Sequence, residues 1–171
     1  ADSMLNYPDF RSSARAIQLM AQVAGRAGRK NKQGLVILQT KSPDLPLIHE
    51  VVTNNYRSLF DEQIAERHLF KYPPFYRLVY VYLKHRKQEV LDQAADVMAR
   101  YLRQGLGERI LGPDLPLVAR IQTLFIKKIM VKVELQASMS KVRAYLRQVQ
   151  RAIAEDERFR SLLVYYDVDP M

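Results

Sequence analysis

Residues 128–135 read KIMVKVEL, and this stretch decides the fold of the second half of the chain. Apolar side chains recur at every second position along it, which is the period of a β-strand with one buried face. The predicted buried face carries Ile129, Val131, Val133 and Leu135, and the opposite face carries Met130, Lys132 and Glu134. Such a strand requires partner strands, which the segments on either side must supply.

The flanking segments alternate between strand and helix patterns. Residues 77–84 (RLVYVYLK) are rich in β-branched and aromatic residues, which is typical of a strand. Residues 88–104 have helical spacing and are expected to end at Gly105 and Gly107, and Ser140 is expected to cap a second helix. Further strands are predicted at 109–114 and 162–168. The order β-α-β-β-α-β predicts an α+β fold, a ferredoxin-like split βαββαβ domain whose four-stranded sheet carries two helices on one face.

The chain before this domain reads as mainly helical. Helices are predicted over residues 11–28, 46–54 and 56–69, the first after a capping Asp9, and a buried strand over residues 35–40 (LVILQT). Pro73 and Pro74 stop the last helix, because proline lacks a backbone N–H and restricts the residue before it. We therefore place a domain boundary near residue 71, with domains at 1–71 and 72–171.

The charge of the chain points to a polyanionic partner. It holds 27 Lys and Arg against 18 Asp and Glu, a net charge of +9, and residues 72–171 supply 17 of the basic and 11 of the acidic residues, or +6. A basic surface attracts nucleic acid through phosphate contacts and counterion release. The absence of cysteine excludes disulfides and thiolate metal sites. No apolar run approaches the ~20 residues that span a membrane, so we expect no membrane partner.

Motifs for nucleotide or metal chemistry are mostly missing. No G-x-x-x-x-G-K-[ST] phosphate loop occurs in the sequence. The acidic pairs Asp61-Glu62 and Asp156-Glu157 do not follow an apolar strand, as a Mg²⁺-holding carboxylate would, and we expect them to be surface charges. The three histidines show no metal-ligand spacing. We predict no metal site.

Residues 22–29 read QVAGRAGR and carry the one pattern suited to phosphate chemistry. Arg26 and Arg29 lie about one helical turn apart, and Gly25, Ala27 and Gly28 leave room for another surface to approach. A guanidinium is always charged and forked, which suits charge on a transferring phosphoryl group. Taken alone, the pattern is also that of a basic helix end exposed to solvent.

This stretch resembles motif VI, Q-x-x-G-R-x-G-R, of superfamily 2 helicases, with the signature positions filled by Gln22, Gly25, Arg26, Gly28 and Arg29. Four further blocks are similar to the primosomal replication-restart helicases of that superfamily: GLVILQT (34–40), ERHLFKYPPFYRL (66–78), LGPDLPL (111–117) and YDVDP (166–170). They cover essentially the whole chain in family order. The chain, which begins without Met, therefore resembles a C-terminal fragment of such a helicase.

The resemblance implies a role for each part. Residues 1–71 would be the end of the second RecA-like lobe, a helical remnant, and residues 72–171 a DNA-binding domain of ribosomal-protein-like fold. Arg26 and Arg29 would act on the γ-phosphate of ATP as catalytic fingers, Gln22 would couple the nucleotide to the lobes, and Gly25 and Gly28 would belong to the same nucleotide site. The phosphate loop, the acidic box that holds Mg²⁺ and a zinc-binding insertion would lie upstream of residue 1, so the chain alone is not expected to hydrolyse ATP.

The resemblance also implies partners and a cellular role. The parent protein would be an ATP-dependent 3′-to-5′ DNA helicase that recognises stalled or branched forks and restarts replication by primosome assembly. Its partners would be forked and single-stranded DNA, the single-stranded-DNA-binding protein and other primosome proteins, in the bacterial cytoplasm at the nucleoid. The isolated lobe remnant is expected to pack on the C-terminal domain or to form a dimer, because strand 35–40 would lack sheet neighbours.

Six basic residues are candidates for DNA contact: Arg120, Lys127, Lys128, Arg143, Arg147 and Arg151. The last three recur every four residues opposite a predicted buried helix face, where they can track a phosphate backbone or be a solvated face. Phe125-Ile126 stands where many family members have an aromatic-Arg pair, so a contact through that arginine is in doubt here. Among tyrosines that could stack on bases, Tyr101, Tyr145, Tyr165 and Tyr166, we expect Tyr145 to pack inside.

Two alternatives remain open on the residues alone. One is a self-contained nucleic-acid- or protein-binding module with a ferredoxin-like sheet and no ATPase ancestry. The other is an interaction domain that docks an acidic partner peptide. Residues 22–29 favour the helicase fragment over a plain binding module, because such a module has no use for them.

Overall fold

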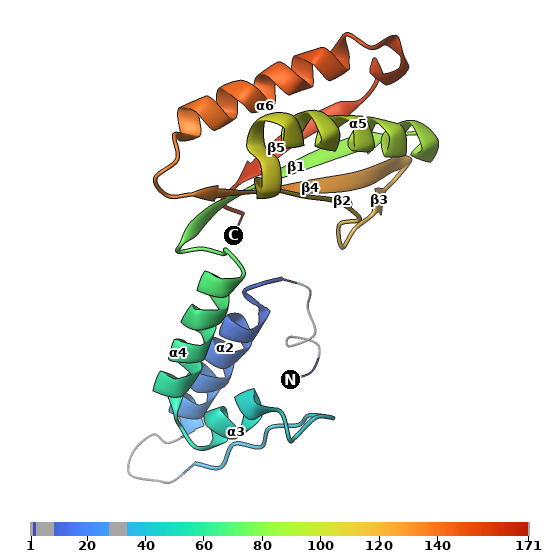
Figure 1. Ribbon diagram of the computed structural model, residues 1–171. Coiled ribbons are helices and arrows are strands. Elements are labelled where there is room, and N and C mark those ends of the chain that lie inside the picture. Colours follow the sequence, from blue (N-terminus) through green and yellow to red (C-terminus); the bar gives the residue numbers. More distant parts are fainter. Residues whose placement is uncertain (1, 3–8, 28–33, 171) are drawn as a thin grey trace. The chain divides into compact units, whose positions relative to one another are not determined.

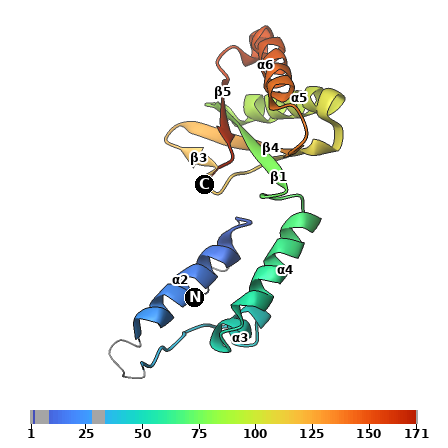
Figure 2. The same cartoon turned by 90° about the vertical axis from the view of Figure 1, so that its left-hand side faces the viewer.

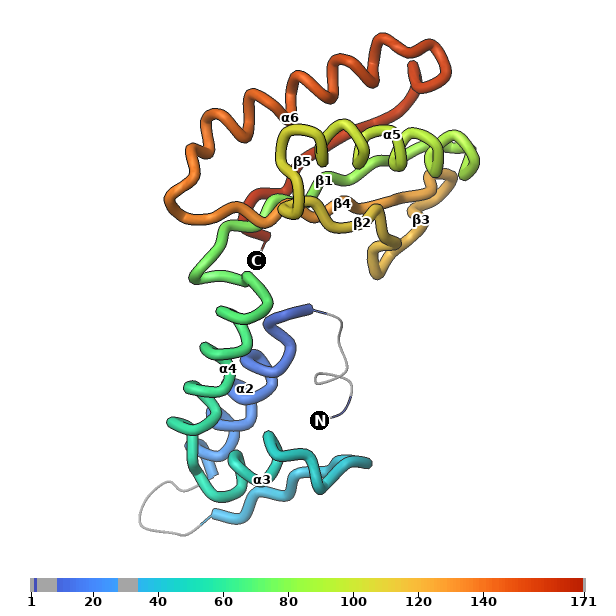
Figure 3. Tube along the Cα trace, in the orientation of Figure 1, coloured from blue at the N-terminus to red at the C-terminus, as the bar shows by residue number. Residues whose placement is uncertain are grey.

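The computed structural model describes residue 2, residues 9–27 and residues 34–170 (Figures 1 and 3). The chain divides into two compact units, Ala1–Phe70 and Lys71–Met171, called here the N-terminal and C-terminal units.

The described part of the N-terminal unit contains the helices α2 (Ser12–Ala27), α3 (Pro46–Val52) and α4 (Tyr56–Leu69). Asn55 caps α4, its side chain accepting the Ser58 N–H at 3.4 Å. Asp9 lies in the turn before α2, where its carboxylate accepts the Arg11 N–H at 2.9 Å. The three predicted helices are thus confirmed, although α3 ends two residues earlier than expected.

The core of the N-terminal unit is small, formed by Ala16, Met20 and Ile48. The prediction of a strand at 35–40 was wrong, because residues 34–40 form no strand. A strand needs a partner for its backbone N–H and C=O groups, and the described part of this unit contains no other strand. Leu35 and Ile37 are consequently 84% and 82% exposed.

The C-terminal unit is an antiparallel sheet with helices on one face (Figures 1 and 2). Its strands run in the spatial order β2-β4-β1-β5, and a short β3 pairs with the start of β4. This order confirms the α+β, split βαββαβ, ferredoxin-like prediction and adds β3 as an unpredicted fifth strand. The elements are β1 (Tyr76–His85), α5 (Gln88–Leu106), β2 (Ile110–Asp114), β3 (Arg120–Ile121), β4 (Leu124–Glu134), α6 (Met139–Ala154) and β5 (Leu163–Val168), with short 3₁₀ turns at Gly107–Arg109 and Glu157–Phe159.

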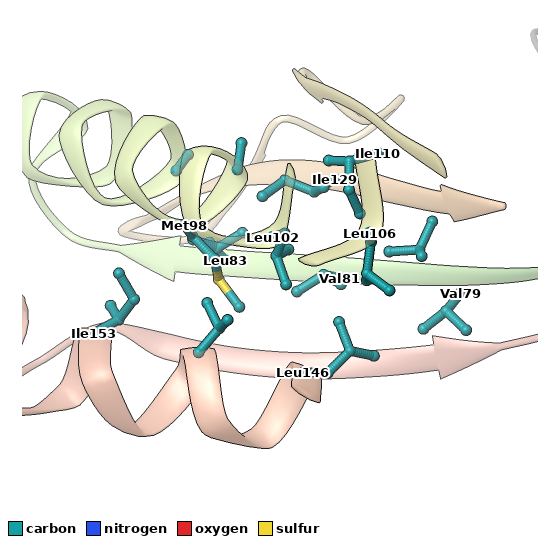
Figure 4. Packing of buried hydrophobic residues seen from close by; sticks show 14 of the residues in the cluster. Val79, Val81, Leu83, Met98, Leu102, Leu106, Ile110, Ile129, Leu146 and Ile153 are labelled. Carbon is teal, nitrogen blue, oxygen red and sulfur yellow. The ribbon is translucent and has the colours of Figure 1, made fainter. Parts of the chain in front are cut away.

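The main core lies between the sheet and the two helices α5 and α6 (Figure 4). Alternate residues of neighbouring strands meet there, with Val79 opposite Val131 and Val81 opposite Ile129. Each fully buried side chain of this size contributes about 1.5–3 kcal/mol relative to exposure. The predicted face of strand 128–135 is therefore confirmed at Ile129, Val131 and Val133. Leu135 lies beyond the end of β4 and is 51% exposed.

Two predictions about helix ends were wrong. Ser138, not Ser140, caps α6, its hydroxyl accepting the Lys141 N–H at 3.4 Å. Gly105 does not end α5 but lies within it, where an added Cβ would come 2.3 Å from Cζ of Tyr145. The glycine is needed for the close approach of the Tyr145 ring rather than for a turn. Gly107, with φ of +59°, is the residue that follows the helix.

Candidate nucleotide and nucleic-acid sites

The last turns of α2 hold three of the predicted nucleotide-site residues: Gln22, Gly25 and Arg26. All three are exposed, and Gln22 and Arg26 share one side of the helix because they are four residues apart. A Cβ placed on Gly25 would meet nothing within 4 Å, so a second surface can approach the backbone there. Gly28 and Arg29 lie outside the described residues. The described part of the motif therefore fits a site that receives a phosphate group from another surface.

The charge around Arg26 is consistent with such a role. Among the described residues, no carboxylate forms an ion pair with Arg26. Arg15, on the first turns of the same helix, instead lies 3.7 Å from Asp9. Within residues 2, 9–27 and 34–170, the Arg26 guanidinium has no carboxylate to release before it accepts an external anion.

The acidic pairs serve as surface charges or structural groups. Asp61 and Glu62 are exposed on α4. Asp156 accepts the Arg158 N–H at 3.0 Å and pairs with its guanidinium at 2.6 Å, which lowers the pKa of Asp156. Across the described residues, no three His, Asp or Glu side chains come together as a metal site would require.

The row of arginines on α6 is exposed along its whole length. Arg143, Arg147 and Arg151 lie opposite the buried face of the helix, which is formed by Met139, Val142, Leu146, Val149 and Ile153. Arg147 and Arg151 line a shallow hollow of about 470 Å³ together with Ala144, Gln148, Ala152 and Glu155. The row is therefore a continuous basic stripe with a depression along it, which suits phosphates or carboxylates.

The remaining three candidates are not brought together with this row. Lys127 forms a 2.9 Å ion pair with Asp92 of α5. Lys128 places its Nζ 4.6 Å from the centroid of the Tyr80 ring. Arg120 donates to the carbonyl of Gln122 at 3.1 Å and lies over the ring of Phe125, the residue at the aromatic-Arg position. Arg120 thus supplies an arginine next to that aromatic ring, from β3 instead of from residue 126.

The sheet face turned away from α5 and α6, called here the outer face, carries Tyr165 and Lys128 of the sequence candidates together with Tyr80, Tyr82 and Lys84, which sequence reasoning did not single out. Tyr80, Tyr82 and Lys84 alternate with the buried residues of β1, and Tyr165 of β5 lies opposite Tyr82. The signal in the sequence was the alternation of VYVYLK, whose Tyr and Lys positions share one face. Lys132, also on this face, is only 9% exposed, and burial lowers its pKa.

The other tyrosines have different surroundings. The prediction that Tyr145 packs inside is confirmed, since its ring packs against the core and its hydroxyl donates to the Tyr101 carbonyl at 2.6 Å. Tyr166 packs against the core and donates to Gln150 at 2.9 Å. Burial raises the pKa of Tyr166 to about 12, with Arg147 acting in the opposite direction. Tyr101 and Tyr165 are 39% and 40% exposed, so of the four they are the most accessible.

None of the helices among the described residues is long and apolar enough to cross a membrane.

Known proteins resemble this chain over its whole length. Residues 68–171 match the sequence model of the family described as Primosomal protein N C-terminal domain. Replication restart protein PriA of Bacillus subtilis is 31% identical over 99% of the chain, and that of Treponema pallidum is 34% identical over 100% of it. The PriA protein of Chlamydia pneumoniae is 44% identical over 46% of the chain. The chain spans 21% of the B. subtilis and 25% of the T. pallidum protein. The chain thus belongs to the primosomal protein N family of replication restart proteins.

Proposed function

We propose that this chain is part of an ATP-dependent 3′-to-5′ DNA helicase that restarts replication at stalled or branched forks in the bacterial cytoplasm. Helix α2 would contribute to ATP hydrolysis, and the C-terminal unit would bind DNA. The observation that carries the proposal is the exposed Gln22–Arg26 side of α2, within a Q-x-x-G-R-x-G-R sequence that a plain binding module would not need.

The nucleotide role rests on Arg26. Bound ATP with Mg²⁺ would supply the phosphoryl group that is transferred to water. Arg26 would place its guanidinium against the charge that develops on that group, where an always-charged, forked donor is most effective. Gln22, on the same side of α2, would contact the same nucleotide and couple it to the lobes. Arg29 would add a second guanidinium. The phosphate loop and the Mg²⁺ and zinc ligands would be supplied outside these 171 residues, since the sequence has no such loop and no cysteine.

The DNA role rests on the charge of the C-terminal unit. Its excess of basic residues includes Arg143, Arg147 and Arg151, which are exposed in a row on α6. Arginine side chains spaced along one helix face can contact successive phosphates of a backbone. Forked DNA, the single-stranded-DNA-binding protein and other primosome proteins are the partners we propose for this unit.

A substitution in the longer protein tests the proposal. Arg26→Ala is expected to lower DNA-stimulated ATP turnover by about 10³-fold or more, because that is the size of an arginine-finger effect. Binding of DNA should change little, since Arg26 lies outside the C-terminal unit. Arg15→Ala is the matched control on the same helix, with a side chain that is 54% exposed. Normal turnover in Arg26→Ala would contradict the nucleotide role and favour the self-contained binding module.

The 171-residue chain alone tests the other half of the proposal. It should show no DNA-stimulated ATP turnover, and it should bind DNA with an affinity that falls steeply as salt rises, because phosphate contacts release counterions. Binding that is indifferent to salt would argue against phosphate contacts.

A further inference from the structure

We propose that the outer face of the sheet binds single-stranded DNA by stacking unpaired bases beside Tyr165 and Tyr82 and by placing Lys84 and Lys128 against the phosphates. This inference rests on the proposed DNA role of the C-terminal unit and assigns it a specific surface. The surface is distinct from the arginine row of α6, which lies on the other side of the sheet with the core between them.

The first support is the arrangement of the rings. Tyr82 and Tyr165 are directly opposite each other on β1 and β5, and their rings stack with centroids 4.9 Å apart at an interplanar angle of 12°. Tyr80 meets Tyr82 edge to face at 6.1 Å. Three tyrosines therefore form one continuous aromatic group. Stacked rings of this kind offer the sequence-tolerant platform on which successive bases of a single strand can stack.

The second support is the exposure of one end of this group. Tyr165 lies on β5, an edge strand of the sheet, and is 40% exposed. On the inner strands β1 and β4, the outer-face residues Leu78 and Ile126 are covered, at 0% and 3% exposure, whereas Leu111 at the β2 edge is 42% exposed. The strip beside β5 is the accessible edge of the outer face at which the aromatic group ends.

The third support is positive charge placed at the rings. Lys84 lies with its Nζ 4.6 Å from the centroid of Tyr165, and Lys128 lies at the same distance from that of Tyr80. A cation beside a stacking ring can meet the phosphate that follows the stacked base. The carboxylates on this face are Glu134, which is paired with Arg109 at 2.7 Å, Asp167, which lies opposite Tyr80, and Asp114, which lies opposite Lys128. Asp167 is the one on β5 beside the stacked rings, so its removal offers an opposite test.

The pairing of rings with cations favours a single strand over a duplex or an acidic peptide. A duplex keeps its bases stacked on each other, so it has no unpaired base to offer a tyrosine platform. An acidic peptide would use the lysines but would leave the rings without a specific role. Bases joined by phosphates satisfy both kinds of group at once.

The experiment uses the 171-residue chain and three fluorescent 15-mers: oligo(dT), an abasic single strand of equal length and charge, and a duplex. The wild-type chain is expected to bind oligo(dT) at least about five-fold more tightly than the abasic strand, because a stacked base contributes that much. Tyr165→Leu should remove most of this difference. Tyr101→Leu is the matched control, since Tyr101 is 39% exposed and lies on α5, away from the outer face.

A second set of variants keeps the test sharp if Tyr165→Leu perturbs the sheet. Lys84→Gln should weaken binding of oligo(dT) and lower its salt dependence, and Asp167→Asn should strengthen binding.

Failure of the wild-type chain to bind any of the three DNAs would overturn the proposed DNA role itself. Equal binding of oligo(dT) and the abasic strand, or equal effects of Tyr165→Leu and Tyr101→Leu, would overturn the stacking face and leave the DNA role standing. An acidic peptide that competes fully with oligo(dT) regardless of the tyrosine variants would make the surface a protein-docking site and overturn the inference.

Discussion

Lys127 and Lys128 are neighbours in the sequence but lie on opposite faces of the sheet. Lys127 turns toward the helices and pairs with Asp92 of α5 at 2.9 Å. Lys128 lies on the outer face, opposite Tyr82 and over the ring of Tyr80. The two-residue period of a strand forces this separation, so two adjacent lysines cannot serve one DNA surface together.

The two lysines should therefore respond differently to the same substitution. Lys128→Gln is expected to weaken single-stranded DNA binding and to reduce the slope of log affinity against log salt by about 0.7, the loss of one phosphate contact. Lys127→Gln should leave that slope unchanged and cost at most about 1 kcal/mol of stability, because it breaks a partly exposed ion pair. Affinity measured across a salt series, together with urea unfolding of each variant, checks both expectations. Equal slopes for the two variants would contradict the assignment of DNA binding to the outer face, which carries Lys128 but not Lys127.

Gly105 and Tyr145 should be strongly coupled. Gly105→Ala alone would force the Tyr145 ring away and break its 2.6 Å hydrogen bond to the Tyr101 carbonyl, so we expect a loss of about 1 kcal/mol. In a Tyr145→Ala background the same change should instead stabilise α5 by about 0.5–1 kcal/mol, because alanine is the better helix former. A double-mutant cycle from urea unfolding measures this reversal. Additive effects of the two substitutions would show that the close approach has no energetic weight.

Asp169 directly follows the end of β5 and continues the pairing with β1 at Leu78. Its carboxylate accepts the Leu78 N–H at 3.1 Å, and its own N–H donates to the Leu78 carbonyl at 2.8 Å. Its φ of +48° is also one that Asp and Asn tolerate better than most residues. Asp169→Ala is therefore expected to cost about 1–2 kcal/mol, and Asp169→Asn much less, in chemical unfolding. A loss as large for Asn as for Ala would mean that the carboxylate charge, and not its hydrogen bond, is what matters.

The sequence predicted most strongly where one local period coincided with the final burial. The alternation at 128–135 identified three of the core residues of β4, and the order of elements identified the split βαββαβ topology. The predictions failed where tertiary contacts determine the local structure. Gly105 looked like a helix stop because its reason, the ring of Tyr145, is 40 residues away in the sequence. Residues 35–40 have a strand composition but no partner strand in the described part of their unit.

The sequence predicted the kinds of candidate site in this chain better than it predicted which residues form each site. Helical spacing predicts that the α6 arginines lie opposite a buried helix face, and they are exposed in the structure. Gln22 and Arg26 are exposed as well. The ion pair of Lys127 with Asp92, which reaches it from α5, could not be predicted from the sequence. The outer-face group of Tyr80, Tyr82 and Tyr165 required the register of β1 with β5, which periodicity does not supply.

Tyr166 should make the stability of the C-terminal unit sensitive to alkaline pH. Burial raises its pKa to about 12 in the folded chain, above the value of about 10 for an exposed tyrosine. A raised pKa means that the folded state holds the neutral phenol more firmly, so this contribution is fully present below about pH 10 and is lost as the pH rises toward about 12. Tyr166→Phe cannot ionise and should therefore lose less stability over that interval than the wild-type chain.

Urea unfolding at a series of pH values measures the difference, and ultraviolet titration of tyrosinate should show one late-titrating group disappear in the variant. Tyr101→Phe, a change at an exposed tyrosine, should behave like wild type in both measurements. If Tyr166→Phe instead follows the wild-type curve, the phenol ionises as easily in the folded chain as in the unfolded one, and its burial against α6 does not control the titration.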